Sequence, residues 1–285
     1  MKKVLLTGGS GFIGRNVIPI MREFCELYVP NRKELNLLDA VAVERYIVDN
    51  QIQVVIHSAN PNPAKNALDV QDRMFEDSLR VFMNLYHAQE HYEMMYTLGS
   101  GAEFDKRMDI VSISEEEENR SVPLDAYGFA KYTINQIIAA SPKQCNLRIF
   151  GCYGPTDHES KFITHAIRCC MRGEDITIRQ NCYFDYMHVF DLAKIMEYFI
   201  YHKPKYRSYN VCTGTRKTLK EIAEEVRRQM NSRKEIVLLA EGWNKEYTGS
   251  NCRLLEEIGD YQFITLEEGV RLQIESELAL GEKEK

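Results

Sequence analysis

The feature that most constrains this chain is a glycine-rich segment directly after its first apolar run, 4–6. The segment reads Thr7-Gly8-Gly9-Ser10-Gly11-Phe12-Ile13-Gly14, and residues 12–24 then carry apolar side chains at helical spacing. Glycines at such a junction allow a tight turn, close approach of a pyrophosphate and close packing of helix on strand. The helix N-terminus also favours phosphate groups through its N–H groups and dipole. The segment therefore predicts a dinucleotide-binding strand–turn–helix unit, in which the cofactor contacts are Gly8, Gly11, Phe12, Ile13 and Gly14.

Strand and helix signals alternate along the first half of the chain. Apolar runs predict strands at 2–7, 26–29, 53–57, 94–98 and 145–150, and helical spacing appears at 12–24, 40–50, 66–92 and 126–140. This alternation is typical of a doubly wound α/β fold, with a parallel Rossmann sheet between two layers of helices. Shorter elements after residue 150 predict a smaller C-terminal α/β lobe. We therefore expect an NAD(P)-binding domain at 1–150 and mainly a substrate-binding lobe at 151–285, of which about 180–215 returns to the first domain.

Composition and charge exclude several classes of function. The net charge of −6 offers no basic face for nucleic acid. No apolar stretch approaches the roughly 20 residues of a spanning helix, and no secretory leader pattern is visible, so we expect a cytoplasmic protein without a membrane partner. The eight cysteines form no C-x-x-C pair, and His87 and His91 lack further ligands, so we expect reduced thiols and no metal site. The acid run at 115–118 is interpreted as a solvated loop.

The segment Tyr127-Gly128-Phe129-Ala130-Lys131 places a phenol and an ammonium group one helical turn apart. The ammonium and the positive charge of an oxidised nicotinamide both favour the phenolate, which lowers the tyrosine pKa from about 10. Such a tyrosine can exchange a proton with a substrate oxygen while hydride moves at the same carbon. We therefore predict that Tyr127 and Lys131 are catalytic and that both also contact the cofactor.

The G-x-x-G-x-x-G spacing and the Y-x-x-x-K pair together resemble the extended short-chain dehydrogenase/reductase superfamily, the NAD-dependent epimerase/dehydratase family. The pattern is most similar to that of GDP-fucose synthase-like nucleotide-sugar 4-ketoreductases. Two later segments extend the resemblance, RIFGCYGP at 148–155 and FDYMHVFDLA at 184–193. The resemblance implies that Ser100, which follows the fourth predicted strand, hydrogen-bonds the reacting oxygen and completes a Ser–Tyr–Lys catalytic set.

The expected cofactor is NADP(H) rather than NAD(H). NAD sites usually place an acid at the end of the second strand, whereas this strand leads into PNRK at 30–33. Asn31 and Arg32 are therefore expected at the ribose end of the cofactor, where a guanidinium suits a 2′-phosphate. The resemblance adds five further cofactor contacts, namely Leu38, Asp39, Ser58, Ala59 and Phe150.

Departures from the family pattern narrow the expected chemistry. Dehydratases of the family carry an Asp-Glu pair directly after the serine or threonine, where this chain has Gly101 and Ala102, so dehydration is disfavoured. GDP-fucose synthases carry a cysteine at the second of these positions and a partner histidine ten residues after the Y-G-P proline. Ala102 replaces the cysteine, whereas His165 keeps the histidine. Half of that epimerising pair remains, and simple reduction of a ketone fits the residues better.

The expected substrate contacts also differ from the family pattern. Gly151 replaces an asparagine, and Phe184 replaces an arginine that often binds phosphate. Arg179 or Arg168 is expected to supply the phosphate contact, and Tyr183 or Phe184 to stack on a base or sugar. The substrate-binding candidates are thus Gly101, Ala102, Gly151, His165, Arg179 and Tyr183.

The sequence favours an NADPH-dependent reductase that delivers hydride to carbon 4 of a nucleotide-linked 4-keto-6-deoxy sugar, with Tyr127 as proton donor. Two alternatives stay open: an NAD-retaining nucleotide-sugar epimerase with the same catalytic residues, and a non-catalytic NADP-binding regulator. The expected partners are a small-molecule nucleotide sugar and a second copy of the chain, because homodimers that pair through two helices are common in this superfamily.

Overall fold

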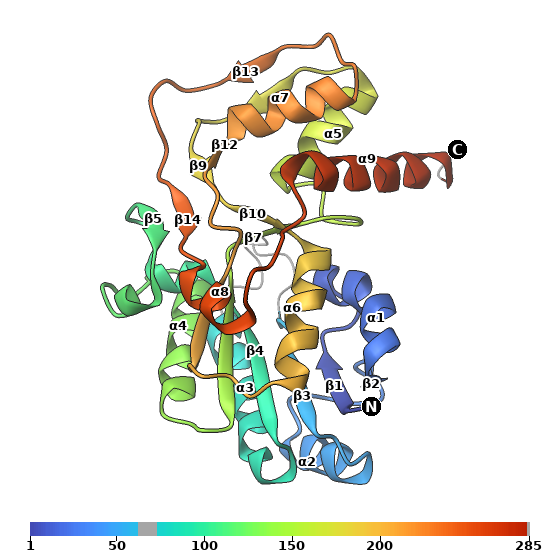
Figure 1. Ribbon diagram of the computed structural model, residues 1–285, viewed down its shortest axis with the longest axis vertical. Coiled ribbons are helices and arrows are strands. Elements are labelled where there is room, and N and C mark those ends of the chain that lie inside the picture. The colour runs from blue at the N-terminus through green and yellow to red at the C-terminus, as the bar shows by residue number, and fades with distance from the viewer. Residues whose placement is uncertain (62–72, 284–285) are drawn as a thin grey trace.

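A six-stranded parallel sheet forms the centre of the computed structural model, which describes residues 1–61 and 73–283 (Figure 1). Its strands lie in the order β11-β6-β4-β3-β1-β2. Buried runs of valine, leucine and isoleucine favour such strands, because helices cover both faces of a parallel sheet. The α/β doubly wound prediction is confirmed. The bounds are β1 (Lys3–Thr7), β2 (Glu26–Tyr28), β3 (Val54–His57), β4 (Met94–Ser100), β6 (Gln144–Ile149) and β11 (Ser208–Val211).

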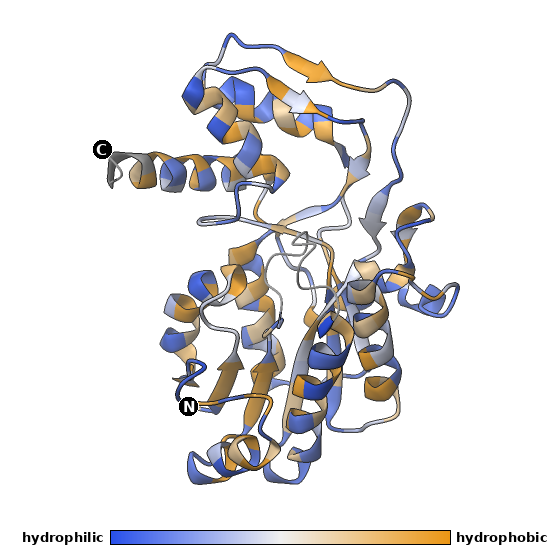
Figure 2. Cartoon of the chain, turned by 180° about the vertical axis from the view of Figure 1, so that it is seen from behind, coloured by the Kyte–Doolittle hydropathy of each residue, from blue (hydrophilic) through white to orange (hydrophobic). Residues whose placement is uncertain are grey.

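Alternating side chains of the central strand β1 enter two different cores. Val4 and Leu6 pack against α1 (Phe12–Phe24) and α6 (Val189–Tyr201), whereas Leu5 faces the opposite layer. That layer holds α2 (Ala40–Asp49), α3 (Met74–His87) and α4 (Ala126–Ala139). Each helix turns its apolar stripe to the sheet and its polar side to solvent (Figure 2). The helix predicted at 66–92 ends at His87 and is followed by the 3₁₀ turn η2 (Gln89–His91); its residues 66–72 lie outside the described part of the chain.

A smaller lobe lies beyond the carboxyl edge of the sheet (Figure 1). Its core consists of α5 (Phe162–Arg172), α7 (Leu219–Gln229) and α9 (Leu266–Lys283), packed with the parallel pair β8 (Ile176–Ile178) and β13 (Ile236–Leu238). The intervening β11 is instead a strand of the central sheet, and α6 packs against that sheet. A domain boundary at residue 150 stays a prediction.

Short strands that the sequence did not indicate connect the lobe to the sheet. β7 (Gly151–Tyr153) pairs with β10 (Tyr186–His188). A second small sheet has the order β12-β9-β14-β5, with β12 (Lys217–Thr218), β9 (Tyr183–Phe184), β14 (Tyr247–Gly249) and β5 (Ile110–Ile113). The short helix α8 (Cys252–Ile258) follows β14. These strands have two to four residues, which is too short for an alternating pattern to identify them.

The expectation of a solvated acid run at 115–118 is confirmed for Glu116 and Glu117, which are exposed, and is wrong for Glu115. Glu115–Glu117 form the 3₁₀ turn η4, and the Glu115 side chain is buried, where it accepts a 2.6 Å hydrogen bond from the Asn210 backbone N–H. Glu118 accepts a 3.2 Å bond from Arg148, and Glu116 pairs with Arg253 at 2.5 Å. Two arginines from distant segments therefore pair with this run, and only Glu115 is withdrawn from solvent.

Within residues 1–61 and 73–283, no helix has the length and apolar character needed to cross a bilayer. The same residues contain no group of three or more potential metal ligands, and the eight cysteines are free thiols.

Candidate active site

A cavity of about 990 Å³ opens between the carboxyl edge of the central sheet and the smaller lobe. The ends of β1, β3, β4 and β6 line it, together with residues of β9 and β14. The chain leaves β1 toward β2 on one side and continues through β3 and β4 on the other, so the cavity lies at the point where the strand order reverses. Ligands of doubly wound sheets bind at this point.

The glycine segment leaves room for the backbone to meet a cofactor. Gly8 has φ +74°, and a Cβ on it would lie 2.7 Å from the Ala59 nitrogen. A Cβ on Gly14 would lie 2.5 Å from the Gly9 Cα, so this glycine permits the close packing of helix and strand. Gly11 caps helix α1 without a side chain, and it lines the cavity together with Phe12 and Ile13 of the first helical turn. The residues present therefore fit a dinucleotide pyrophosphate.

Most of the predicted cofactor residues line this cavity: Gly8, Gly11, Phe12, Ile13, Asn31, Arg32, Leu38, Ser58, Ala59, Tyr127, Lys131 and Phe150. Two of the predicted residues do not. Gly14 lies behind the loop against Gly9, and Asp39 caps helix α2, where its carboxylate accepts a 3.1 Å bond from the Ala42 N–H. Asp39 therefore caps helix α2 in this structure, and its neighbour Leu38 reaches the cavity; a cofactor contact by Asp39 stays a prediction.

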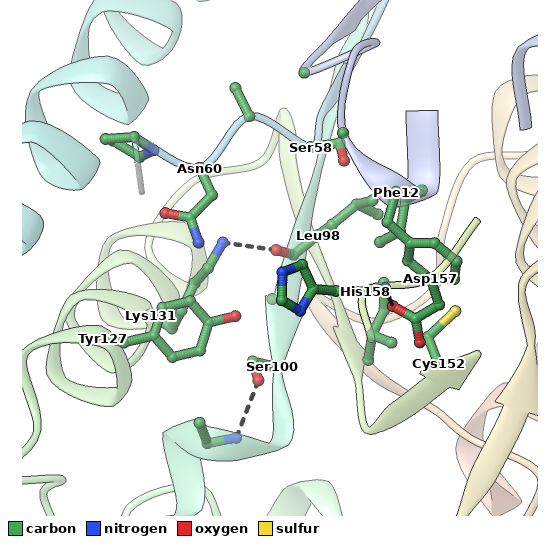
Figure 3. A pocket seen from close by; sticks show the side chains of 18 of the residues that line it. Phe12, Ser58, Asn60, Leu98, Ser100, Tyr127, Lys131, Cys152, Asp157 and His158 are labelled. Carbon is green, nitrogen blue, oxygen red and sulfur yellow. Dashed lines mark hydrogen bonds between the residues drawn. The ribbon is translucent and has the colours of Figure 1, made fainter. Parts of the chain in front are cut away.

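The three predicted catalytic residues meet at the cavity wall (Figure 3). Tyr127 lies in the first turn of α4, which begins because the Asp125 carboxylate accepts a 2.9 Å bond from the Gly128 N–H. The Lys131 ammonium lies 6.0 Å from the centre of the Tyr127 ring and donates a 2.8 Å bond to the Leu98 carbonyl at the end of β4. The Tyr127 hydroxyl points into the cavity between Lys131 and Ser100.

Ser100 is held by a capping box at the start of η3 (Gly101–Phe104). Its hydroxyl accepts a 3.2 Å bond from the Ala102 N–H, and its own N–H donates at 2.9 Å to Glu103. The Glu103 carboxylate is buried and also accepts bonds from Arg148 at 2.8 Å and from Asn146 at 3.0 Å. A buried ion pair therefore fixes the backbone that presents Ser100. The sequence marked Arg148 only as part of a family segment and did not identify Glu103.

His57 lies at the end of β3, near Lys131. Its Nδ1 is 3.0 Å from the Thr7 hydroxyl, which also accepts N–H bonds from Ser58 and Ala59. Burial, followed by the nearby Lys131 charge, lowers the pKa of His57 to about 3. The imidazole is therefore neutral and holds the two loops that border the cofactor side of the cavity.

The predicted substrate residues are divided between the cavity and the surrounding structure. Ala102 and Gly151 line the cavity, whereas Gly101 lies behind it against Phe150 and Tyr247. His165, Arg179 and Tyr183 do not line the cavity, so their roles as substrate contacts stay predictions.

Each of these three side chains has other neighbours. Helix α5 turns His165 toward Cys169 and Thr177. Arg179 is exposed just beyond β8. The Tyr183 ring lies between Arg216, 4.1 Å away, and Trp243, whose ring stacks on it at 5.0 Å. Arg168, the alternative to Arg179, pairs with Glu277 at 2.8 Å.

The cavity also contains side chains that the sequence did not single out. Asp157, His158 and Lys161 line the cavity and follow the Y-G-P segment directly in the sequence. Their closeness to this family motif was a signal from which their place in the cavity could have been predicted. Lys106 comes from the loop before β5, and Tyr247 comes from β14. Tyr247 carried no sequence signal, because a three-residue strand far along the chain brings it back beside Gly101.

Comparison with known proteins agrees with this geometry. The model of the NAD dependent epimerase/dehydratase family matches residues 4–212. The ADP-L-glycero-D-manno-heptose-6-epimerase of Brachyspira hyodysenteriae is 22% identical over 308 residues, which cover 94% of this chain and 95% of that protein.

Solved structures share the fold. A GDP-D-glycero-L-gluco-heptose synthase of Campylobacter jejuni, in the presence of NADPH, has a TM-score of 0.85 at 16% identity, covering 97% of this chain and 98% of that one. The GDP-mannoheptose C4 reductase of the same organism, with NADP bound, has a TM-score of 0.83 at 16% identity and the same coverage. Because the family model spans most of the chain, this protein belongs to the NAD dependent epimerase/dehydratase family, the extended short-chain dehydrogenase/reductase enzymes that use a nicotinamide cofactor.

Proposed function

We propose that the protein is an NADPH-dependent reductase of a nucleotide-linked 4-keto sugar, with a 6-deoxy sugar as the first candidate. The observation that carries this proposal is the convergence of Ser100, Tyr127 and Lys131 on one cavity that also contains the glycine cradle. The proposal divides the chain near residue 150 into a cofactor domain and a mainly substrate-binding lobe.

The bound cofactor would supply hydride to the carbonyl carbon of the sugar. The Ser100 hydroxyl donates a hydrogen bond to the carbonyl oxygen and stabilises the charge that develops there. Tyr127 gives its proton to the same oxygen, and the Lys131 ammonium stabilises the phenolate that remains. Lys131 is well placed for this task, because its bond to the Leu98 carbonyl holds the ammonium beside the tyrosine.

Two features support reduction over dehydration and NADPH over NADH. Elimination of water needs an acid and a base next to the serine, and Gly101 and Ala102 carry no ionisable group there. At the other end of the cavity Arg32 is exposed and lines the wall, and Asn31 lies beside it. A guanidinium at this position suits a 2′-phosphate.

The nucleotide-sugar substrate is proposed from the relatives and from charge. The names of the similar proteins include ADP-linked and GDP-linked heptoses. The family arginine is Phe184 here, but Lys106, Lys161 and Lys245 line the cavity and offer positive charge for a diphosphate. We therefore propose GDP-linked 4-keto sugars, both 6-deoxyhexoses and heptoses, as the first substrates to test.

The test is consumption of NADPH, followed at 340 nm, with a panel of 4-keto sugars linked to GDP, UDP, CDP or dTDP. We expect turnover with at least one of them, a loss of about 100-fold or more in Tyr127→Phe, and unchanged NADPH affinity in that variant. Absence of turnover across the panel would refute the reductase.

One observation favours a second candidate, an epimerase that retains its cofactor. The Brachyspira relative, which aligns along nearly the whole chain, is a 6-epimerase. In that case the purified protein would carry tightly bound oxidised cofactor, and product stereochemistry would change without net consumption of NADPH.

A further inference from the structure

The loop between β7 and α5, residues 154–161, forms one wall of the cavity. Asp157, His158 and Lys161 of this loop line the cavity. Figure 3 shows Asp157 and the catalytic Tyr127 on opposite sides of the pocket. A substrate that occupies the cavity therefore meets this loop on the side away from the tyrosine.

The backbone of the loop is held in an unfavourable conformation. Thr156 has φ +62°, in the left-handed region that a β-branched residue rarely adopts. Such a conformation persists only where the surrounding structure holds it in place. Inside the loop, the Asp157 N–H donates a 3.2 Å bond to the Gly154 carbonyl. The remaining contacts to the turn come from helix α1, at the cofactor side of the cavity.

Asn16 of α1 supplies the shorter of these contacts. Its side chain is buried, and its Nδ2 donates a 2.9 Å bond to the Phe12 carbonyl and a 2.8 Å bond to the Pro155 carbonyl. A side-chain amide nitrogen carries two hydrogens, and these two bonds use both of them. One amide group therefore connects the first turn of α1 with the turn that leads to Asp157.

Arg15, the neighbour of Asn16, makes a second connection between the same two segments. Its guanidinium donates a 2.7 Å bond to the Ser10 carbonyl and a 3.4 Å bond to the Thr156 carbonyl. Ser10 and Phe12 both line the cofactor side of the cavity. Arg15 is exposed and its bond to the loop is longer, so the buried Asn16 makes the stronger connection.

We propose that Asn16 is a positioning residue: its amide connects the loop 154–161 to the first turn of α1, so that a bound nicotinamide cofactor orders the substrate wall of the cavity. A pyrophosphate at the N-terminus of α1 restricts the motion of the first turn. A first ligand that orders a shared segment lowers the entropy cost of binding a second, and this coupling is reciprocal. The connection itself depends only on cofactor binding, whereas its kinetic consequence rests on the proposed reductase function.

Hydrogen exchange followed by mass spectrometry tests the connection without any substrate. Four N–H groups of the loop are hydrogen-bonded within it, those of Asp157, His158, Ser160 and Lys161. Their exchange rates therefore report how well the loop is ordered. In the wild type we expect NADPH, added at ten times its measured Kd, to slow this exchange about 5-fold or more.

Two variants of Asn16 remove the connection. We expect NADPH, again at ten times the Kd of each variant, to slow exchange in the loop less than about 2-fold in Asn16→Ala. Asn16→Leu nearly keeps the shape of the amide and removes both donors, so it should behave like Asn16→Ala even if the alanine variant folds poorly. Loop exchange that NADPH leaves unchanged in the wild type, or slows equally in the wild type and both variants, overturns the proposal.

Asn50→Ala is the matched control. The Asn50 Nδ2 donates a 2.8 Å bond to the Tyr46 carbonyl four residues earlier, which is the same local bond that Asn16 makes to Phe12. Asn50 lies at the C-terminal end of α2, and its loss should lower the free energy of unfolding without changing the response of the loop to NADPH. An equal loss of that response in this control would mean that general loosening of the fold explains the Asn16 result, and the proposal would fail.

Kinetics with the proposed keto-sugar substrates separate this inference from the reductase proposal. Because the loop meets the substrate away from the reacting carbonyl, Asn16→Ala should raise the KM for the keto sugar about 5-fold and leave kcat nearly unchanged. A fall in kcat at unchanged KM would contradict the positioning role in an enzyme that still reduces keto sugars. If no keto sugar is turned over, the reductase proposal fails and the exchange measurement alone decides the role of Asn16.

Discussion

Replacement of Glu103 by alanine should destabilise the protein far more than its position in a four-residue 3₁₀ turn suggests. The carboxylate accepts bonds from the Ser100 N–H at 2.9 Å, from Asn146 at 3.0 Å and from the Arg148 guanidinium at 2.8 Å. The Arg148 side chain is 0% exposed and its guanidinium lies 4.6 Å from the Phe104 ring centre. Glu103→Ala therefore leaves a buried positive charge with fewer partners.

The size of the effect follows from what remains around Arg148. Removal of one partner from a buried ion pair costs about 3–5 kcal/mol of unfolding free energy. Arg148 keeps Glu118 at 3.2 Å and Asn210 at 3.0 Å, and Glu118 is itself 24% exposed. Because Arg148 keeps these two partners, we expect the loss of unfolding free energy to lie near the lower end of that range, at about 3 kcal/mol. This is a large share of the roughly 5–15 kcal/mol that stabilises a typical domain.

Urea unfolding followed by circular dichroism measures this loss. Glu76→Gln is the matched control, because Glu76 pairs with Arg80 at 2.8 Å on the surface of α3, where both side chains are more than half exposed at 53% and 54%. Such an exposed pair contributes at most about 0.5 kcal/mol. A Glu103→Ala protein within about 1 kcal/mol of the wild type, or a control that loses as much, would refute the reasoning from burial.

Three further predictions concern residues around the cavity. Gly101→Ala should lower kcat about 10-fold, because its Cβ would lie 2.6 Å from the Tyr247 hydroxyl; steady-state kinetics check this, and unchanged kcat would contradict it. Arg32→Ala should raise the Kd for NADPH about 10- to 100-fold and leave that for NADH nearly unchanged in fluorescence titrations; equal losses for both would rule out a 2′-phosphate contact. Because burial lowers the pKa of His57 to about 3, the unfolded chain binds one more proton between pH 6.5 and pH 3, and stability falls by about 1.4 kcal/mol per pH unit of acidification. His57→Asn should reduce this slope in urea unfolding at pH 7 and pH 5, and an identical slope would contradict the assignment.

The parts of this protein that sequence reasoning predicted are those with a local cause. The glycine segment, the buried runs of β1, β3, β4 and β6, and the i, i+4 spacing of Tyr127 and Lys131 each involve a few neighbouring residues. The errors involve partners that are distant in the chain. The burial of Glu115 within the acid run at 115–118 was not predicted, because its hydrogen-bond partner Asn210 lies far along the sequence. His165 keeps the expected spacing from a family motif, but it contacts Cys169 and does not line the cavity, so its role as a substrate contact stays a prediction.

The departures from the family pattern look like independent losses in the sequence, but in the structure they form one packed unit. Gly101 lacks the acid of the dehydratases, and the Tyr247 hydroxyl fills the space, 2.6 Å from the missing Cβ. Gly151 lacks an asparagine, and the Phe184 ring lies 2.8 Å from that Cβ position. Phe184 and Tyr247 then pack on each other, with ring centres 4.9 Å apart. Since these residues depend on one another for space, a change back to the family residue at one position would clash with the side chain that now occupies the space. The substrate side of the cavity therefore differs from the family pattern as a unit, because Phe184 and Tyr247 fill the space of the absent side chains. An activity inferred only from the missing acid and arginine would overlook these two aromatic residues.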